Sequence, residues 1–227
     1  MDPSIRTALV TGSDSGLGRA VALTLADDRF HLGLAYATDR DNVEDTAKKV
    51  RTKSVRAAVR RMDLADIADA VTAVDEFAGE LGGIGVLVNC PGSIAVECIQ
   101  RAVRYMIAGG EGGRIVNIIT ELPRAGGLTG LLATRLARYS ITVNAVVLPT
   151  VEPSFAGPEH DRSEATSVVS YLTSAATASV TGTAYVVDGT SITMIPHGLI
   201  EAGSSRAAHR ARTHPHTGHW APTRWTP

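Results

Sequence analysis

Cysteine, aromatic residues and long apolar stretches are all scarce in this sequence. Only two cysteines occur among 227 residues, and Phe, Trp and Tyr together make up 4%. Two cysteines are too few for a disulfide scaffold in a chain of this size, which favours a reducing compartment. No apolar run approaches the roughly 20 residues that a membrane span needs, and no basic stretch followed by an apolar one begins the chain as in a signal peptide. We therefore expect a cytoplasmic protein without a membrane partner.

An excess of charge of either sign is also missing. The 22 Lys and Arg residues almost balance the 23 Asp and Glu residues, so the composition gives no reason to expect a nucleic-acid partner. With 44% hydrophobic residues, the chain is long enough for one well-buried domain. We place this domain at residues 1–198.

The last part of the chain, residues 199–227, differs from the rest in composition. It is basic, rich in Arg, His and Pro, and without periodicity, which predicts a flexible tail. Its histidines have alternating spacing that would suit a metal, but no carboxylate or cysteine lies nearby, so we expect a solvated tail and no metal site. These histidines are His209, His214, His216 and His219.

The hydrophobic pattern before this tail alternates between strands and helices. Short apolar runs predict strands, which are Thr7–Val10, Phe30–Tyr36, Val55–Met62, Val86–Asn89, Arg114–Ile119, Ile141–Val147 and Ala184–Val187. Helical spacing between them predicts helices at Arg19–Ala26, Val43–Val50, Ile67–Leu81, Leu131–Arg138 and Ala165–Ser174, with a further helical stripe at Ile99, Val103 and Met106. Continuous apolar strands separated by helices predict an α/β fold, a single doubly wound parallel sheet with helices on both faces.

A glycine-rich turn follows the first predicted strand and opens the first helix. It reads Thr11-Gly12-Ser13-Asp14-Ser15-Gly16-Leu17-Gly18. Glycines at such a turn let the backbone approach a pyrophosphate, and the helix N-terminus supplies N–H groups and a positive dipole end for the anion. Such a turn alone is weak evidence, but between a strand and a helix it favours dinucleotide binding.

Several motifs together resemble the short-chain dehydrogenase/reductase family. They are the TGxxxGxG spacing of the turn, Asp63-Leu64, Asn89-Cys90-Pro91-Gly92, GRIVNI at residues 113–118, ITVNAV at 141–146 and the segments 180–182 and 187–189. The resemblance runs from about residue 5 to residue 193, and its nearest type is the 3-oxoacyl-carrier-protein reductase. It implies a Rossmann-type fold, a nicotinamide dinucleotide as cofactor and reduction of a small-molecule carbonyl or acyl thioester.

The resemblance also implies where the cofactor would bind. The pyrophosphate turn would be Thr11, Gly12, Ser15, Gly16, Leu17 and Gly18, and Asp63 and Leu64 would lie beside the adenine. Asn89 and Gly92 belong to the family's NNAG element, which reads NCPG here.

The choice between NAD and NADP depends on the end of the second predicted strand. An acid there would hold the ribose 2′-hydroxyl of NAD, but the sequence has Tyr36-Ala37-Thr38-Asp39-Arg40. Thr38 and Arg40 could accept a 2′-phosphate, which favours NADP(H) over NAD(H). Asp39 is near enough to reverse this preference.

The catalytic set implied by the resemblance is incomplete. The family uses a Ser that polarises the carbonyl, a Tyr that donates the proton and a Lys four residues after it that lowers the phenol's pKa. Thr120 takes the Ser position and keeps a hydroxyl. The only lysines are Lys48, Lys49 and Lys53, and no tyrosine has a lysine four positions later.

The segment Gly126–Gly130 admits two alignments. If it follows the family's Lys, Ala125 and Glu121 stand where Lys and Tyr would be. If it is the loop after the preceding strand, the whole Tyr/Lys helix is absent.

The chain is also short on the catalytic side of the sheet. Residues 92–114 are too few for the usual helix with its catalytic Asn, residues 120–141 are too few for the Tyr/Lys helix, and the substrate loop at 149–165 is abbreviated. Three interpretations are open: a degenerate nucleotide-binding protein with a regulatory or partner role, a repurposed site that uses Thr120 with Glu121 or Arg124, or an ordinary reductase whose working form contains further active-site stretches. Family members usually assemble through the two shortened helices, so a homo-oligomer is expected by resemblance only.

Overall fold

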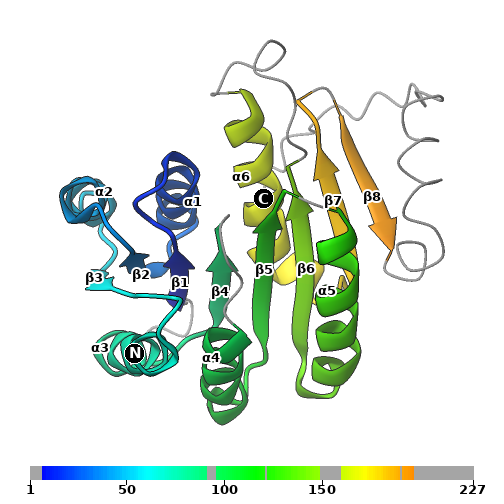
Figure 1. Ribbon diagram of the computed structural model, residues 1–227, viewed down its shortest axis with the longest axis horizontal. Coiled ribbons are helices and arrows are strands. Elements are labelled where there is room, and N and C mark those ends of the chain that lie inside the picture. Colours follow the sequence, from blue (N-terminus) through cyan, green and yellow to red (C-terminus); the bar gives the residue numbers. More distant parts are fainter. Residues whose placement is uncertain (1–6, 91–95, 121, 149–159, 190, 197–227) are drawn as a thin grey trace.

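One eight-stranded sheet forms the centre of the structure, a computed structural model that describes residues 7–90, 96–120, 122–148, 160–189 and 191–196. The strand order is β3-β2-β1-β4-β5-β6-β7-β8, with seven parallel strands and β8 antiparallel at one edge (Figure 1). The strands are β1 (Thr7–Thr11), β2 (His31–Tyr36), β3 (Ala57–Arg61), β4 (Val86–Asn89), β5 (Gly113–Ile119), β6 (Ile141–Val147), β7 (Thr183–Val187) and β8 (Ile192–Pro196).

Helices cover both faces of this sheet, as predicted for a doubly wound fold. Side chains of α1 (Gly16–Asp27), α2 (Arg40–Arg51) and α6 (His160–Thr173) share one apolar core with the sheet. Those of α3 (Ile67–Leu81), α4 (Val96–Gly109) and α5 (Leu122–Leu136) share the core of the opposite face. A 3₁₀ turn, Ala137–Tyr139, links α5 to β6. The strand order reverses between β1 and β4, and doubly wound sheets bind their ligands at such a switch point.

The helices between β4 and β6 correct two expectations from the sequence. Residues 92–114 and 120–141 were expected to be too short for the family's helices, yet they hold the 14-residue α4 and the 15-residue α5. Gly126–Gly130 lies inside α5, so the alternative that made it a loop after the strand is wrong. Each segment therefore still contains a helix with side chains in the core beside the sheet.

Further differences concern where elements start. The sequence placed the helical segment before β6 at Leu131–Arg138, whereas α5 begins at Leu122. It contained no prediction for β8, which pairs with β7 in antiparallel register from Thr183↔Pro196 to Val187↔Ile192. The helical stripe in α4 is confirmed as core, since Ile99 and Met106 are buried and Val103 is packed against them.

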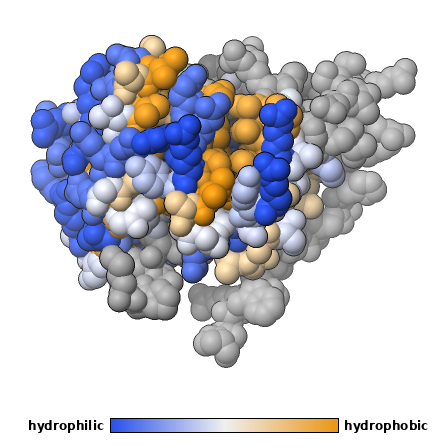
Figure 2. All heavy atoms as spheres, turned by 90° about the horizontal axis from the view of Figure 1, so that it is seen from below, coloured by the Kyte–Doolittle hydropathy of each residue, from blue (hydrophilic) through white to orange (hydrophobic). Residues whose placement is uncertain are grey.

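The surface seen from below the view of Figure 1 includes an apolar area framed by hydrophilic side chains (Figure 2). Among the exposed large apolar residues, Val96 and Ile107 belong to α4, and Leu131 belongs to α5. In the described part of the chain, no helix has both the length and the apolar character that crossing a membrane requires.

Candidate nucleotide site

The glycine-rich turn lies at the carboxyl end of β1, beside the switch point of the sheet. Gly12 has a φ of +61°, a backbone conformation that side chains with a Cβ rarely adopt. A Cβ on Gly18 would lie 2.2 Å from the carbonyl oxygen of Gly12. The turn can therefore be this tight only with glycine at both positions.

The turn is held in place by hydrogen bonds that leave part of the helix N-terminus free. The Ser13 N–H donates to the carbonyl of Ala35 in β2 at 2.8 Å. The Ser15 hydroxyl donates to the Gly12 carbonyl at 2.8 Å and accepts from the Gly18 N–H at 2.9 Å, which makes Ser15 the N-cap of α1. The N–H groups of Gly16 and Leu17 have no acceptor in the described part of the chain, so they remain available to an anion at the positive end of the helix dipole.

The loop after β2 carries Thr38 and Arg40, the two residues predicted to accept a 2′-phosphate. Both are exposed. The Thr38 N–H donates to Asp14 at 3.0 Å, and Asp39 caps α2 by accepting from the Asn42 N–H. The side chain of Arg40 is 71% exposed and lies 3.8 Å from Glu44, a surface ion pair that costs little to break.

Asp63 and Leu64 follow β3 at the same edge of the sheet. The Asp63 N–H donates to the Asp69 carboxylate at 2.7 Å, and an Asp63 carboxylate oxygen accepts from the Ala65 N–H at 3.0 Å. Leu64 packs against the core on the α3 and α4 face. These bonds fix the loop, and the partly exposed Leu64 can offer apolar surface to a ring at this edge.

Asn89 and Thr11 were expected at the cofactor, but both side chains lie buried within the sheet. Thr11, Asn89 and Asn117 stand side by side on β1, β4 and β5, and all three are buried. The Asn89 amide donates to Asn117 at 2.8 Å, and the Thr11 hydroxyl accepts from the Cys90 N–H at 3.3 Å. These side chains join the strands that carry the site. Gly92 lies outside the described residues.

Thr120 directly follows β5 and is exposed at the carboxyl edge of the sheet. Two positions later α5 begins, so the Tyr/Lys positions of the remaining alignment fall on Glu121, outside the described residues, and on Ala125 in the first turns of α5. Neither position therefore holds the phenol that donates the family's proton or the ammonium that lowers a phenol's pKa.

The described tyrosines with shifted acidities are unsuited to replace the missing proton donor. Tyr105 donates to Asp75 at 2.9 Å, between α4 and α3, and this hydrogen bond raises the pKa of its phenol. Burial raises the pKa of Tyr185. Both pKa values are raised, whereas a neighbouring ammonium would lower the pKa of a phenol.

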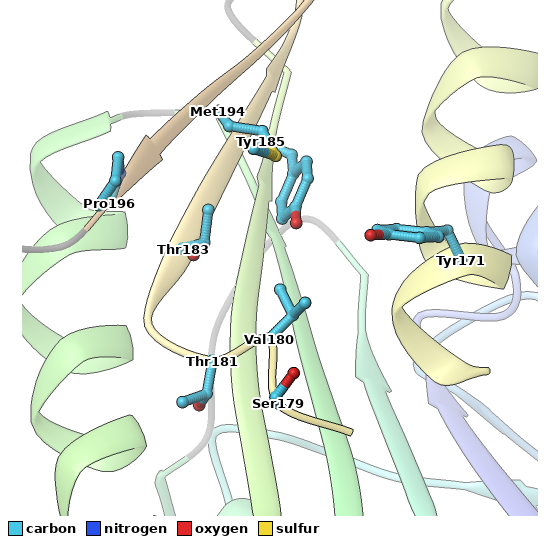
Figure 3. Close-up of a pocket in the computed structure, with 8 residues that line it drawn as sticks. All are labelled: Tyr171, Ser179, Val180, Thr181, Thr183, Tyr185, Met194 and Pro196. Carbon is cyan, nitrogen blue, oxygen red and sulfur yellow. The ribbon is translucent and has the colours of Figure 1, made fainter. Parts of the chain in front are cut away.

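Two surface hollows lie away from the glycine-rich turn. One, of about 330 Å³, lies on the α6 side of β7, where Tyr171 faces Tyr185 with ring centres 6.5 Å apart (Figure 3). The other, of about 310 Å³, lies between α5 and the start of β7. Both involve the segment that leads into β7, at the amino end of that parallel strand. Neither belongs to the nucleotide edge.

Other candidate groups are buried or lie outside the described residues. Cys90 is buried in the apolar core, and burial raises its pKa to about 12. Cys98 is also a free, buried thiol. No cluster of metal-ligating side chains occurs among the described residues, and the histidines of 199–227 lie outside them.

Sequence reasoning missed Asp14, whose carboxylate reaches from the glycine-rich turn to the loop after β2. Its partners are backbone N–H groups, which have no signature in the sequence. The only available signal was an acid inside a turn otherwise made of small residues.

Comparisons with known proteins agree with this architecture. Residues 6–97 match the short chain dehydrogenase family. The uncharacterized oxidoreductase YohF of Escherichia coli is 32% identical over 242 residues, covering 81% of this chain and 94% of that protein. The chain belongs to the short-chain dehydrogenase/reductase family. It is therefore related to oxidoreductases that bind NAD(P)(H) and act on small molecules.

Further members of the family show the same similarity. The crystal structure of acetoin dehydrogenase YohF from Salmonella typhimurium has a TM-score of 0.74 and 31% identity, covering 82% of this chain and 96% of that one. The 3-oxoacyl-[acyl-carrier-protein] reductase FabG of Staphylococcus aureus is 26% identical over 179 residues, covering 62% of this chain and 72% of that protein.

The alignment with the Escherichia coli relative also measures how short this chain is. The alignment spans 242 positions and includes 81% of the 227 residues of this chain, which is about 184 residues. About 58 positions of the alignment therefore have no residue in this chain. From the sequence, we expect the missing positions on the catalytic side of the sheet and a glycine-rich half of full length.

Proposed function

We propose that this protein is a short-chain dehydrogenase/reductase that binds a nicotinamide dinucleotide and, in the form of this sequence, reduces carbonyl substrates poorly. The observation that carries the proposal is the glycine-rich turn at the switch point of the sheet, where the N–H groups of Gly16 and Leu17 at the start of α1 have no acceptor among the described residues. The turn fits a pyrophosphate because Gly12 and Gly18 allow close backbone approach, while Gly16 and Leu17 offer free N–H groups.

The residues around the turn suit the rest of a dinucleotide. Asp63 and Leu64 lie where the adenine would bind, and the buried Asn89 holds β4 to β5 beneath the site. When bound, the nicotinamide supplies the hydride for carbonyl reduction. Thr120 is the one hydroxyl that we place at the substrate carbonyl, where its O–H would donate a hydrogen bond to the oxygen.

The proposed impairment follows from the missing proton donor. Reduction of a carbonyl leaves an alkoxide that must be protonated, and general acid catalysis contributes about 10²–10⁴-fold in rate. The lysines lie on α2 and just after it, remote along the sheet from β5. With no Tyr/Lys pair, Thr120 is the one position of the family's catalytic set that we can assign to stabilise the developing negative charge.

Turnover measurements test this proposal. The substrates are acetoin with the oxidised cofactor and a 3-oxoacyl thioester with the reduced one, each assayed with both NAD(H) and NADP(H). The protein should match its calculated mass of 23.8 kDa, so that no further active-site stretch is present. We expect cofactor binding with turnover at least about 10²-fold below a relative that has the Tyr/Lys pair. Turnover equal to such a relative, and dependent on Thr120, would overturn the impairment.

The missing Tyr and Lys also favour a second class of function. A member without hydride chemistry can serve as a nucleotide-binding regulatory or partner protein, or its site can be repurposed around Thr120. Thermal denaturation separates these possibilities from a purely structural role, because any ligand that binds the folded state raises the melting temperature. A shift with NAD(P)(H) and no turnover supports the binding protein, and no shift at millimolar cofactor contradicts both proposals.

Five finer predictions remain part of this proposal. Thr38 and Arg40 favour NADP(H) over NAD(H). The exposed apolar side chains of α4 and α5 support a homo-oligomer formed through these helices, to be checked by light scattering. The domain over residues 1–198, the flexible tail over 199–227 and the cytoplasmic location stay predictions.

A further inference from the structure

Asp14 connects the glycine-rich turn to the loop that follows β2. Its Oδ2 atom accepts hydrogen bonds from three consecutive backbone N–H groups, those of Ala37 at 3.1 Å, Thr38 at 3.0 Å and Asp39 at 3.4 Å. The Thr38 hydroxyl lies 3.4 Å from the same oxygen. Consecutive N–H groups that converge on one point form a concave anion site, and here a carboxylate of the chain itself fills it.

A second set of hydrogen bonds holds this arrangement rigid. The Asn42 side chain donates to the Asp14 carbonyl at 2.8 Å and accepts from Arg19 at 3.1 Å. The Asn42 N–H donates in turn to the carboxylate of Asp39 at 3.0 Å. The turn, the loop and the start of α2 are thus one connected unit, so the position of the Asp14 carboxylate is well defined.

The Asp14 carboxylate is charged at neutral pH. Burial raises the pKa of this carboxyl group, but hydrogen bonds from the backbone N–H groups of Thr38, Asp39, Asp14 itself and Ala37 outweigh burial, and the pKa lies below its ordinary value of 3.8. The group is only partly buried. All hydrogen bonds that this carboxylate accepts from other described residues go to Oδ2, which leaves Oδ1 available as an acceptor at this edge.

The surroundings are unfavourable for a 2′-phosphate. Three N–H groups that would bind it are already used by Asp14, and the Asp39 carboxylate adds a second negative charge nearby. Arg40 is the nearest cation in sequence, but its side chain extends toward Glu44 and is largely exposed. Bringing a phosphate dianion against two carboxylates costs free energy through like-charge repulsion.

We infer that Asp14 is the residue that selects the cofactor: its Oδ1 accepts a hydrogen bond from the adenosine ribose hydroxyl, and its charge excludes the 2′-phosphate. The protein therefore prefers NAD(H) to NADP(H), which revises the expectation from Thr38 and Arg40. Asp14 takes the part of the acid that is missing from the end of β2. This inference rests on the proposed nucleotide site.

Dissociation constants for NADH and NADPH test the inference on the full chain, measured by the fluorescence of the reduced nicotinamide. We expect the wild-type protein to bind NADH at least about tenfold more tightly than NADPH. The variant Asp14→Asn keeps an acceptor for the loop but removes the charge, so its ratio of the two constants should approach one. Asp28→Asn is the matched control, because Asp28 is exposed at the other end of α1 and should leave the ratio unchanged.

Each outcome separates this inference from the proposed function. Binding of neither cofactor by the wild-type protein overturns both. Tighter binding of NADPH than of NADH by the wild-type protein overturns the role of Asp14 but not the proposed function. The same holds if the ratio of the two dissociation constants is unchanged in Asp14→Asn, or if only Asp39→Asn shifts it. If Asp14→Asn fails to fold, as judged by circular dichroism, Asp14→Ser replaces it. The wild-type protein must then still bind NADH more tightly than NADPH, and Asp14→Ser must bring the ratio of the two dissociation constants toward one.

Discussion

Gly18 has less room for a Cβ than Gly12, the other glycine that shapes the turn. A Cβ there would lie 2.2 Å from the Gly12 carbonyl oxygen and 2.9 Å from the Ser13 Cα. Both neighbours are backbone atoms, so no side chain can move aside, and the turn itself would have to shift. Since α1 begins at Gly16, a shift of the turn would also displace the N–H groups that we assign to the pyrophosphate.

We therefore predict that Gly18→Ala weakens nicotinamide dinucleotide binding at least about tenfold and lowers the free energy of unfolding by about 1–3 kcal/mol, the usual cost of overpacking. The measurements are a cofactor titration and denaturant unfolding. Gly79→Ala is the matched control, because a Cβ at Gly79 in α3 would contact nothing within 4 Å. It should leave binding unchanged and stabilise the helix by up to about 1 kcal/mol. Equal effects of the two substitutions would contradict this account.

At the scale of single residues, the sequence predicted the groups that act through backbone geometry. Gly12, Gly16 and Gly18 were placed correctly at the turn because their spacing reflects a local requirement. Asp14 was not recognised, because its role depends on N–H groups 23 to 25 residues later in the chain. The buried pairing of Asn89 with Asn117 was missed for the same reason, since it depends on strand register.

Among the helices, α3 and α4 are joined by a polar cluster on the catalytic side of the sheet. Arg101 of α4 donates two hydrogen bonds to the Asp75 carboxylate of α3, at 2.5 and 2.6 Å, and Tyr105 donates a third at 2.9 Å. The Arg101 hydrogen bond lowers the pKa of Asp75, burial opposes this shift, and the Tyr105 hydrogen bond adds to it. This cluster helps to hold α4 in a segment that has lost much of its length.

The stability that Asp75 contributes should therefore depend on pH. Because its pKa is lower in the folded than in the unfolded protein, the contribution is complete above the ordinary value of 3.8 and is lost as pH falls through the folded pKa. The difference in unfolding free energy between the wild type and Asp75→Asn should be largest near about pH 6 and shrink below about pH 3. Denaturant unfolding at both pH values measures it, with Asp28→Asn as the control, and a difference that does not change with pH would contradict the assignment.

The elements that were predicted well are those with a strong pattern of their own. β4, β6 and α3 have the predicted bounds, because continuous apolar runs and a clear helical period are local features. The start of α5 was placed too late because Gly126, Gly127 and Gly130 are poor helix formers, and packing of the helix on β5 and β6 outweighs that preference. β8 is a short edge strand with mostly exposed side chains, so its pairing with β7, and not its own pattern, defines it.

For the molecule as a whole, we infer a full-length nucleotide half and a shortened catalytic half from the motif spacing and the unmatched alignment positions. The alternation of strands and helices was enough to predict the doubly wound sheet, because seven parallel strands need helical crossovers. The shortened segments were recognised from the sequence, but their consequence for the fold was not. Both α4 and α5 persist because their apolar side chains still complete the core on that face of the sheet.

The central claim is that the glycine-rich turn of this chain binds a nicotinamide dinucleotide, and a calorimetric titration of the full chain with NADH tests it most directly. The account predicts saturable binding of one NADH per chain by the wild-type protein, and loss of most of this affinity in Gly18→Ala while Gly79→Ala retains it. Absence of binding at millimolar NADH and NADPH, or binding that is equally strong in Gly18→Ala, would contradict it.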